Sequence, residues 1–435
     1  MTQSDTMDFL QFLDNSPTCY HAVANLAAEL TRHSYTVLSE SDRWQLSPGG
    51  SYFVTRGGSS LLAFRIPDGN IHGFQLAAGH SDSPTLKLRQ NAEVPSAGDC
   101  LRLSVEPYGG GIWRSWMDCP LSVAGRVMTA EDNGTVRSRL VNVDRDLLSI
   151  PSLAIHMNRE VNKNGGLDVS KDLLPLFGCG KAGQFQALIA QTAGVPEERL
   201  LSTELFLYPR TKATRVGVNE EFVLSPRLDD LQCVYGCFQG FLMAQASESI
   251  PVLCVFNNEE VGSGTRQGAD STFLTDILQR ISAGLHWDSE QSAAALANSF
   301  LVSADNAHAV HPAHPEYADA NESPRLNGGI VLKYNAAQRY TTDAFSAALF
   351  LSLCRKADVP VQRYSNRADL PGGFTLGNIS TAHLSVPSVD IGLPQLAMHS
   401  ACELAGAQDT DTLVKAMTAY FSASFRRLPD GTATF

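Results

Sequence analysis

The chain has 435 residues, of which 43% are hydrophobic and 18% charged, with a formal net charge of -12 at pH 7 and a pI near 5.4. This size and composition allow a large core and more than one domain, and the acidic balance argues against a nucleic-acid partner. No segment is long and apolar enough to span a membrane, and the first residues lack the pattern of a signal peptide. The nine cysteines show no CxxC spacing, so we expect a cytoplasmic protein with reduced cysteines.

Helix and strand patterns alternate near the amino terminus. In residues 16–35, Ser16 and Pro17 predict a helix start before apolar residues at helical spacing. Residues 60–67 and 71–84 predict two strands, the second ending in a polar turn. The pattern then changes to short strand-like runs, CLRLSVEPY, LSVAGRVM and ELFLYP, between Gly, Pro and Asn turns. We therefore expect residues 92–220 to form an inserted β-rich domain.

The alternation returns after the insertion. It predicts a helix, a buried strand, a second helix and a further strand at residues 229–247, 250–258, 341–359 and 360–365. Such alternation predicts an α/β fold, with a mostly parallel sheet covered by helices on both faces. We expect residues 1–91 and 221–435 to form this domain together.

Polar side chains gather at the predicted strand ends, where ligands bind in open α/β sheets. The clusters are His80 and Asp82 in AAGHSDSP, Asp229 and Asp230 in SPRLDDLQ, Glu259 and Glu260 in NNEEVGSG, Asp305 in FLVSADNA, and His399 in PQLAMHSA. Carboxylate and imidazole donors without thiolates suit Zn²⁺, Mn²⁺ or Co²⁺ in a hydrolytic site. The sequence therefore indicates a metal centre.

The spacing within two clusters suggests a division of tasks. His80 and Asp82 are two residues apart, so in an extended chain they point to the same side, where the carboxylate could orient a metal-binding imidazole. Glu259 and Glu260 are adjacent and point in different directions. One of them could bind a metal while the other acts as a base.

Each cluster also has a simpler structural explanation. His80 and Asp82 could belong to a surface turn, and Asp229 with Asp230 could cap a helix and stabilise its dipole. The glutamates could lie in a solvated loop, Asp305 could hold a turn, and His399 could be a hydrogen-bonded core residue. For any single cluster the structural role is the expected one. Their occurrence together, at successive strand ends, favours a functional site.

The same motifs carry a family resemblance. GHSD, RLDD, NNEEVGS, SADNAHAVHP and MHSACE together resemble the aspartyl aminopeptidase and vacuolar aminopeptidase I family of dinuclear zinc exopeptidases. LKYNAAQRYTTD and GGFTLG match as well, and so do GGGIWRSWMDCPLSVAGRV and PSLAIHMNR within the insertion. The resemblance covers almost the whole chain. It implies a zinc exopeptidase-like catalytic domain and two divalent metal ions per chain, Zn²⁺ first, with Co²⁺ or Mn²⁺ as alternatives.

The resemblance also implies a role for each residue of the motifs. It assigns His80 and Asp305 to one metal, Glu260 and His399 to the other, and Asp229 to the bridge between them. Glu259 would be the general base, and Asp82 would support the first histidine. Asp230 stands where many relatives have Asn, which leaves open which of the two aspartates bridges; we assign the bridge to the first acid of the motif.

Further residues concern the substrate and the assembly. The resemblance implies that His156, in LAIHMNRE, reaches the active site of a neighbouring subunit and binds substrate; a surface or interface histidine and an additional zinc ligand are the alternatives. Lys333, in LKYN, is a candidate for binding a substrate carboxylate, against a merely solvated lysine. The family implies a homo-oligomer, a dodecamer, that admits short peptides with a free N-terminus.

The predicted function is that of a metalloaminopeptidase. It would remove acidic or neutral N-terminal residues from short peptides, using a water at a dinuclear metal centre and Glu259 as general base. One alternative is a scaffold of the same fold with altered catalysis. Another is a nucleotide-binding oxidoreductase, suggested by GSGTRQG after a strand, although the glycine spacing differs from a dinucleotide loop and two acids precede it.

Overall fold

The computed structural model describes residues 7–163, 166–245, 247–370, 373, 375–428, 430 and 432–435. Its largest sheet has nine described strands in the order β1-β2-β3-β13-β4-β14-β18-β16-β17. Their bounds are β1 Thr36–Leu38, β2 Ser51–Arg56, β3 Ser60–Arg65, β4 Gly73–His80, β13 Ser249–Phe256, β14 Phe300–Ala304, β16 Ile330–Tyr334, β17 Val361–Ser365 and β18 Ser388–Gly392. β4 lies parallel to both β13 and β14, and β14 is parallel to β18. β3 and β16 form the antiparallel pairs, so the sheet is mixed and mostly parallel, which confirms the predicted fold class.

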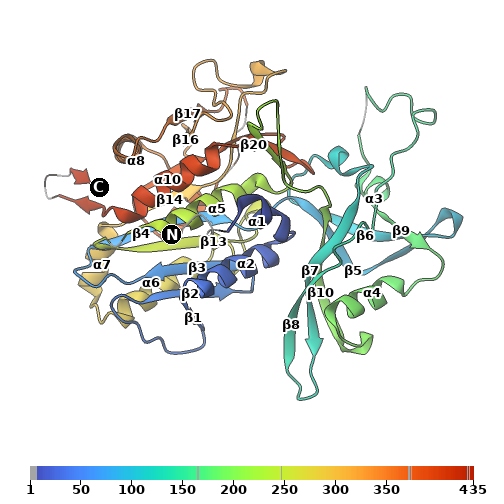
Figure 1. The fold of residues 1–435 in the computed structure, drawn as a ribbon, viewed down its shortest axis with the longest axis horizontal. Helices are drawn as coiled ribbons and strands as arrows, with labels where there is room; N and C mark the ends of the chain where they lie inside the picture. Colours follow the sequence, from blue (N-terminus) through green and yellow to red (C-terminus); the bar gives the residue numbers. More distant parts are fainter. Residues whose placement is uncertain are drawn as a thin grey trace.

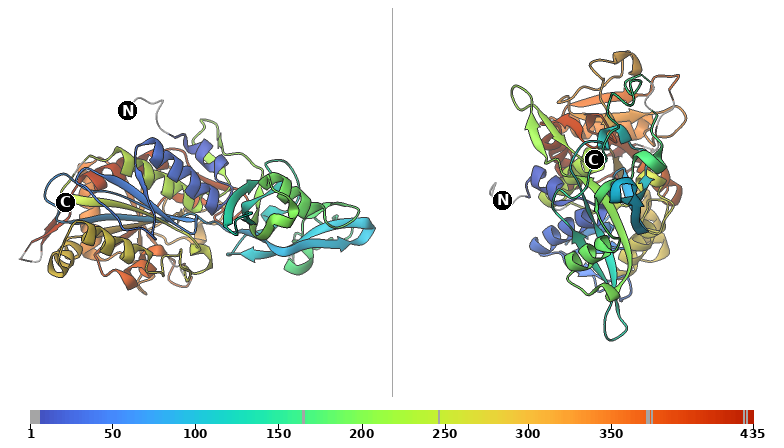
Figure 2. Two further views of the ribbon diagram at one scale, coloured as in Figure 1. Left: turned by 90° about the horizontal axis from the view of Figure 1, so that it is seen from below. Right: turned by 90° about the vertical axis from the view of Figure 1, so that its right-hand side faces the viewer.

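Helices cover both faces of this sheet (Figures 1 and 2). One face packs against α1 Phe9–Asn15, α2 Cys19–Arg32, α5 Leu228–Met243, α8 Ala344–Lys356 and α10 Asp409–Ser422. The other packs against α6 Phe273–Gly284, α7 Ser289–Ala297 and α9 Leu376–His383. Along β13, Leu253 and Val255 join the first core while Val252 and Cys254 join the second. Because alternate strand residues face opposite layers, a strand buried on both sides is a continuous apolar run.

The first helical region differs from the prediction. Residues 16–35 were expected to begin a helix at Ser16, but α1 ends at Asn15 and the Ser16 N–H donates to the Leu13 carbonyl oxygen at its C-cap. α2 begins only at Cys19, after the N-cap Thr18. The predicted helix therefore exists but starts three residues later than expected, because Ser16 closes the preceding helix instead of opening the next one.

A second, antiparallel sheet lies at one side of the molecule, at the right of Figure 1, in the order β8-β7-β10-β5-β6-β9. Its strands are β5 Thr85–Ser96, β6 Cys100–Tyr108, β7 Leu121–Ala130, β8 Val136–Asn142, β9 Leu176–Cys179 and β10 Leu200–Pro209, and α3 Val169–Asp172 and α4 Gln184–Ala193 accompany them. The sheet has a core cluster of its own, which includes Leu103, Val123 and Leu205. The predicted boundary between residues 91 and 92 falls inside β5, and the domain division itself stays a prediction.

Smaller elements connect these parts. A third sheet contains β11 Thr214–Val216, β12 Phe222–Ser225, β20 Glu403–Gly406, β19 Pro394–Leu396 and β15 Ala307–His308. A hairpin near the carboxyl terminus contains β21 Arg426–Arg427 and β22 Ala433–Thr434. The described 3-10 turns are η1 Ala97–Asp99, η2 Trp113–Trp116, η3 Glu197–Arg199, η4 Glu259–Val261 and η5 Pro315–Tyr317. The first residue of β20 in this sheet is the buried Glu403, which lies close to the predicted site residues.

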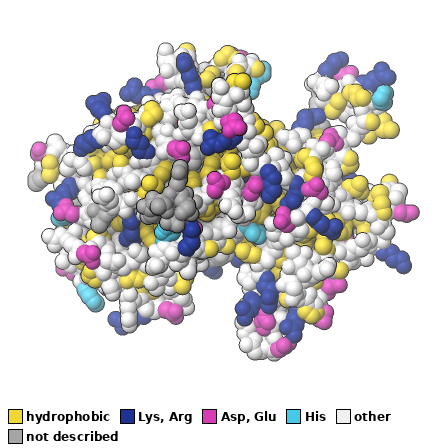
Figure 3. Space-filling model, in the orientation of Figure 1, with side chains coloured by type: hydrophobic (Ala, Val, Ile, Leu, Met, Phe, Trp, Pro, Cys, Tyr) yellow, Lys and Arg dark blue, Asp and Glu magenta, His cyan; other side chains and the backbone are white. Residues whose placement is uncertain are grey.

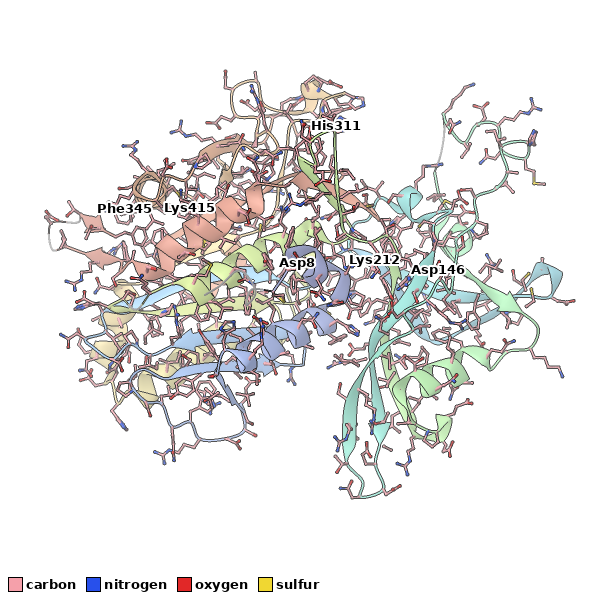
Figure 4. All side chains as sticks on the ribbon, in the orientation of Figure 1. Asp8, Asp146, Lys212, His311, Phe345 and Lys415 are labelled. Carbon is pink, nitrogen blue, oxygen red and sulfur yellow. The ribbon has the colours of Figure 1, made fainter. Side chains whose placement is uncertain are left out.

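Polar contacts link the antiparallel sheet to the part of the chain that carries the nine-stranded sheet. Lys212, three residues after β10, has its Nζ 3.5 Å from Asp14 Oδ2 near the end of α1; Lys212 is labelled in Figure 4. Arg126 of β7 donates to the Gly57 carbonyl oxygen, between β2 and β3, at 2.6 Å. These contacts hold the two sheets in one orientation at the edge where the predicted site residues lie.

One segment of the insertion stands away from the rest. Residues 151–163 form the projection at the upper right of Figure 1, and the space-filling view shows it separated from the main body (Figure 3). All side chains from residue 151 to 160 are exposed, including the apolar Leu153, Ile155 and Met157. None of the helices in the described part of the chain has the length and apolar character needed to cross a bilayer.

Candidate metal centre

The predicted ligands meet at one edge of the nine-stranded sheet. His80 is the last residue of β4, and the pairing of β4 with β13 places Phe256 beside it. The turn η4, Glu259–Val261, follows two residues later and therefore begins next to His80. On the other side of β4, Asp305 follows β14 directly. The carboxyl ends of parallel strands thus bring these side chains together.

Asp229 and Asp230 enter the site from the start of α5. Neither has helical backbone angles, and the peptide bond between them is cis. The recorded N-cap of α5 is Arg227, without a side-chain capping bond, so the aspartates do not have the capping role that we considered for them. Instead, Asp229 Oδ1 lies 3.3 Å from His80 Nε2, and Asp230 Oδ2 accepts the backbone N–H of His80 at 3.1 Å.

Asp229 lies between two groups of candidate ligands. Its Oδ1 faces His80, while its Oδ2 lies 3.4 Å from His399 Nε2. His399 Nε2 is also 3.5 Å from Glu260 Oε1, and His80 Nε2 is 4.0 Å from Asp305 Oδ1. Ligand atoms within 4.8 Å of one another form three groups, His80/Asp229/Asp230/Asp305, Asp229/Glu260/His399 and His80/Glu259/Glu260. The first two groups share Asp229, and Asp230 belongs to the first.

Burial and mutual charge strongly perturb these groups. Burial raises the pKa of Glu259 to about 8, with the charges of Asp305 and Asp82 adding to the effect, and burial raises the pKa of Asp305 to about 6 despite nearby Lys333. Burial opposes protonation of His399, but its contact with Asp229 and the charge of Glu260 raise its pKa to about 10. Carboxylates held this close together are costly to ionise unless cations lie among them.

Asp82 holds several parts of the site in place. Its Oδ1 accepts the Glu259 N–H and its Oδ2 the Glu260 N–H, both at 3.2 Å, so one carboxylate fixes the backbone of both glutamates. The Asp82 Oδ1 lies 3.4 Å from His80 Nδ1, while the backbone carbonyl oxygen of Asp82 is closer, at 3.0 Å. Asp82 therefore contacts the first histidine through its backbone as well as its carboxylate. This leaves Nε2 of the ring facing the aspartates.

Tyr108 is a site residue that the sequence analysis missed. It is the last residue of β6 in the antiparallel sheet, and its O–H donates to Asp82 Oδ2 at 2.7 Å. The hydroxyl oxygen of Tyr108 also accepts a hydrogen bond from Asn258 Nδ2, at 2.8 Å. Tyr108 thus links the insertion to the turn that carries Glu259. Its position at the end of CLRLSVEPY was the available signal, because strand ends are where site residues collect.

Glu403 is the second missed residue. This buried side chain accepts the His399 N–H at 2.6 Å through Oε1 and the Asp229 N–H at 3.0 Å through Oε2. Burial, with the charge of Asp229, raises its pKa to about 8. The His399 backbone has a φ of 68°, and its Nδ1 contacts the Gly110 carbonyl oxygen at 2.8 Å. A glutamate four residues after the histidine in MHSACE was the signal for this clamp.

The two predicted substrate-binding residues, Lys333 and His156, differ in burial: Lys333 is buried and His156 is exposed. Lys333 is only 3% exposed, and its Nζ donates to the Asn306 carbonyl oxygen at 2.8 Å and lies 3.8 Å from Asp305 Oδ2. It is buried and paired within the chain, rather than solvated as the alternative had it, and its contact with a substrate stays a prediction. His156 lies in the exposed 151–163 segment and belongs to none of the candidate metal groups in the described chain.

The residues at this centre fit divalent metal ions. Asp229 Oδ1, Asp230 Oδ1 and Glu260 Oε1 are buried yet lack a hydrogen-bond partner among the described residues. Buried carboxylate oxygens are rarely left without a partner. The donor set of carboxylates and imidazoles is the one that zinc and related ions bind in hydrolytic enzymes. Both the unpaired atoms and their chemistry therefore match a metal centre.

Comparison with known proteins identifies the family. A family model described as aminopeptidase I zinc metalloprotease (M18) matches residues 12–421. The chain belongs to the M18 family of zinc aminopeptidases. A probable M18 family aminopeptidase 2 of Clostridium novyi is 41% identical over 410 residues, covering 92% of this chain and 95% of its own. Aspartyl aminopeptidase 1 of Schizosaccharomyces pombe is 38% identical over 452 residues, covering 96% and 95%.

A solved structure of the S. cerevisiae mApe1 dodecamer is also similar to this M18 aminopeptidase. It is 27% identical, and the match covers 95% of each chain with a TM-score of 0.84. The resemblance inferred from the motifs is thereby confirmed, as is the assignment to zinc-dependent peptide hydrolases. Membership of this family sets aside the nucleotide-binding oxidoreductase suggested by residues 262–268.

Proposed function

We propose that this M18 aminopeptidase works through two divalent metal ions that share Asp229. The observation that carries the proposal is the position of Asp229, whose Oδ1 faces His80 and whose Oδ2 faces His399. Asp305 would complete the first site and Glu260 the second. We propose Zn²⁺ as the native ion, with Co²⁺ or Mn²⁺ as alternatives, because the donors are imidazoles and carboxylates.

Glu259 is the proposed general base. Glu260 shares a candidate ligand group with Asp229 and His399, whereas Glu259 occurs only in the group with His80 and Glu260, which lacks Asp229. This difference supports a ligand role for Glu260 and a free carboxylate for Glu259. When bound, the two metals would lower the pKa of a water and polarise the scissile carbonyl. Glu259 would take the proton of the attacking water and deliver it to the leaving amine. Asp82, through the Glu259 N–H, would hold the base in place.

The proposed substrates are short peptides with a free N-terminus. The S. pombe relative is named an aspartyl aminopeptidase, which supports an acidic N-terminal residue as the first candidate, with neutral residues as the alternative. The buried ammonium group of Lys333, which contacts Asp305, a backbone oxygen and the Tyr340 ring, supplies positive charge beside the centre. That charge favours an anionic substrate group near Lys333.

The proposed assembly is a homo-oligomer, a dodecamer as in the similar S. cerevisiae structure. Residues 92–220 would form its oligomerisation domain, beside a catalytic domain of residues 1–91 and 221–435. Leu153, Ile155 and Met157 are 57%, 48% and 75% exposed on the projecting segment. Apolar side chains gathered on a projection are typical of a protein interface. They support the proposal that His156 enters the active site of a neighbouring subunit.

The first experiment measures hydrolysis of aminoacyl-arylamides and dipeptides by zinc-loaded protein, with a chelator-treated sample and an N-acetylated substrate as controls. Release that depends on metal and on a free N-terminus is expected, and the substrate series gives the side-chain preference. The Glu259→Gln variant should lose about 10²- to 10⁴-fold in kcat while its metal content stays unchanged. Glu290→Gln, on the exposed surface, is the matched control. No hydrolysis by fully metal-loaded wild type would favour the altered scaffold.

A mixing experiment tests the role of His156. Co-assembly of the Glu259→Gln and His156→Ala variants should regain activity, because some sites would combine an intact Glu259 with an intact His156 from a neighbouring subunit. Each variant alone should have low kcat with normal metal content. Failure of mixed assemblies to regain activity, with subunit exchange verified by mass, would contradict the shared site. Loss of metal in His156→Ala would instead favour the ligand alternative.

A further inference from the structure

Two cysteines of the antiparallel sheet face each other on neighbouring strands. Cys100 begins β6, Cys179 ends β9, and the two are direct partners in the antiparallel register. The Gly180 N–H donates to the Asp99 carbonyl oxygen at 2.9 Å, which makes the cysteines a non-hydrogen-bonded pair. In such a pair the Cα atoms lie about 4.5 Å apart and the side chains are closest.

The geometry of the pair suits a covalent bond. The Cys100 and Cys179 Sγ atoms are 3.8 Å apart, in contact but not bonded. Disulfides form between residues whose Cα atoms are about 4.4–6.8 Å apart, a range that contains the separation of a non-hydrogen-bonded pair. Closing the remaining gap therefore needs side-chain rotation rather than backbone movement.

Exposure distinguishes Cys179 from the other cysteines. Cys179 is exposed and Cys100 partly exposed, so a dissolved reagent can reach them. Cys119 and Cys402 are partly exposed like Cys100, whereas the remaining cysteines are buried, namely Cys19, Cys233, Cys237, Cys254 and Cys354. Because thiol exchange requires access to the attacking sulfur, reaction should begin at Cys179.

We propose that Cys100 and Cys179 form a reversible modification site that closes to an intrachain disulfide on reaction with a low-molecular-weight disulfide. The Cys179 sulfur attacks one sulfur of the reagent, which breaks its S–S bond and releases one thiol. The Cys100 sulfur then attacks the mixed disulfide at Cys179 and releases the second thiol. The two protons of the cysteine thiols end on the two released thiols, and the reagent takes both electrons.

The disulfide would connect β9, the edge strand of the antiparallel sheet, to its neighbour β6. β9 has four residues, lies at the end of the strand order and pairs with β6 across a register irregularity. A disulfide would fasten this short edge strand to its neighbour. It would also close a loop that contains β7, β8 and the projecting 151–163 segment, and would so restrict the unfolded chain. The oxidised form should therefore resist local opening of the insertion better than the reduced form.

The test uses assembled, zinc-loaded protein and oxidised glutathione as the probe. Two thiols per chain should be lost, with a mass decrease of about 2 Da for two hydrogens. A non-reducing peptide map should join the peptides of Cys100 and Cys179, and dithiothreitol should separate them. Amide hydrogen exchange within Leu176–Cys179 should slow at least several-fold on oxidation, because an edge strand tied to its neighbour opens less often.

Variants separate this reaction from other thiol chemistry. Cys100→Ser should stop at a stable glutathione adduct on Cys179, because the second attacking sulfur is missing. Cys119→Ser, which removes a partly buried thiol elsewhere in the insertion, should form the disulfide as wild type does. A lasting glutathione adduct on wild-type Cys179, a cross-link between two chains, or no loss of thiols would each overturn the proposal.

Discussion

Replacing Glu403 by glutamine tests whether this residue positions two metal ligands. Its carboxylate accepts one backbone N–H from His399 and one from Asp229. Glutamine has a single acceptor oxygen, and its NH₂ group would face the other N–H. One buried donor would therefore lose its partner, and the backbone of one ligand would be free to shift.

The structure sets the size of both expected effects. Above the pKa of about 8 that burial gives Glu403, its carboxylate is ionised. At such a pH a hydrogen bond to this charged group contributes about 1.5–3 kcal/mol, and an unsatisfied buried donor costs about 1–3 kcal/mol. We expect Glu403→Gln to reduce the free energy of unfolding of the metal-free chain by about 2–4 kcal/mol. Loss of a group that orients metal ligands typically weakens metal binding about 10- to 100-fold, and we expect the zinc Kd to rise by that factor.

Asp409→Asn is the matched control. Asp409 is fully buried, and its carboxylate also accepts two backbone N–H groups, from Asn327 at 2.7 Å and Gly329 at 2.9 Å. Neither donor is a predicted ligand, so this variant should lose similar stability while its zinc Kd stays unchanged. Unfolding in urea and zinc competition with a chromophoric chelator measure the two quantities. Equal zinc affinity in Glu403→Gln and wild type would refute the positioning role.

Three further results are expected. Tyr108→Phe should lower kcat about 10- to 100-fold, the equivalent of one charged hydrogen bond, without changing metal content in elemental analysis; a normal kcat would show that the link to Asp82 does not matter for turnover. Burial beside the charge of Arg227 lowers the pKa of His21 to about 4 from 6.5, so the unfolded chain binds that proton first and stability should fall as pH drops from about 6.5 to 4. His21→Gln should flatten this slope in urea titrations at several pH values, and an unchanged slope would assign it to other groups. Chelation should lower the thermal midpoint, because each ion present at about 1,000 times its Kd stabilises the fold by about 4 kcal/mol; an unchanged midpoint after verified metal removal would contradict this.

The strands that position the site were predictable because burial on both faces leaves a simple pattern. Residues 250–258 were expected as a strand and contain most of β13, and CLRLSVEPY matches β6 at both ends. The end of β4 at His80 followed from the change from apolar to polar residues. Since parallel strands end at a common edge, the grouping of polar residues there could be predicted without coordinates.

The connections between those residues could not be predicted in the same way. Tyr108 meets Asn258 across 150 residues, and Glu403 meets Asp229 across 174. The local spacing of residues in the sequence does not predict such hydrogen bonds, because they depend on how the two sheets and their loops pack. The backbone at Asp229 is another example, since LDDL at a helix start is also a common capping sequence, and only the tertiary fold turns its carboxylates toward His80.

The charge of the centre connects its stability with its chemistry. The carboxylates that meet there, Asp82, Asp229, Asp230, Glu259, Glu260 and Asp305, outnumber the nearby cationic groups His80, His399 and Lys333. Burying unpaired like charges strongly disfavours a fold unless some are protonated or cations neutralise them. Two divalent ions would supply four positive charges to this set. We therefore infer that the adjacent glutamates of η4, just after β13, are compatible with a partly buried position because metal binding is part of folding at this edge of the sheet.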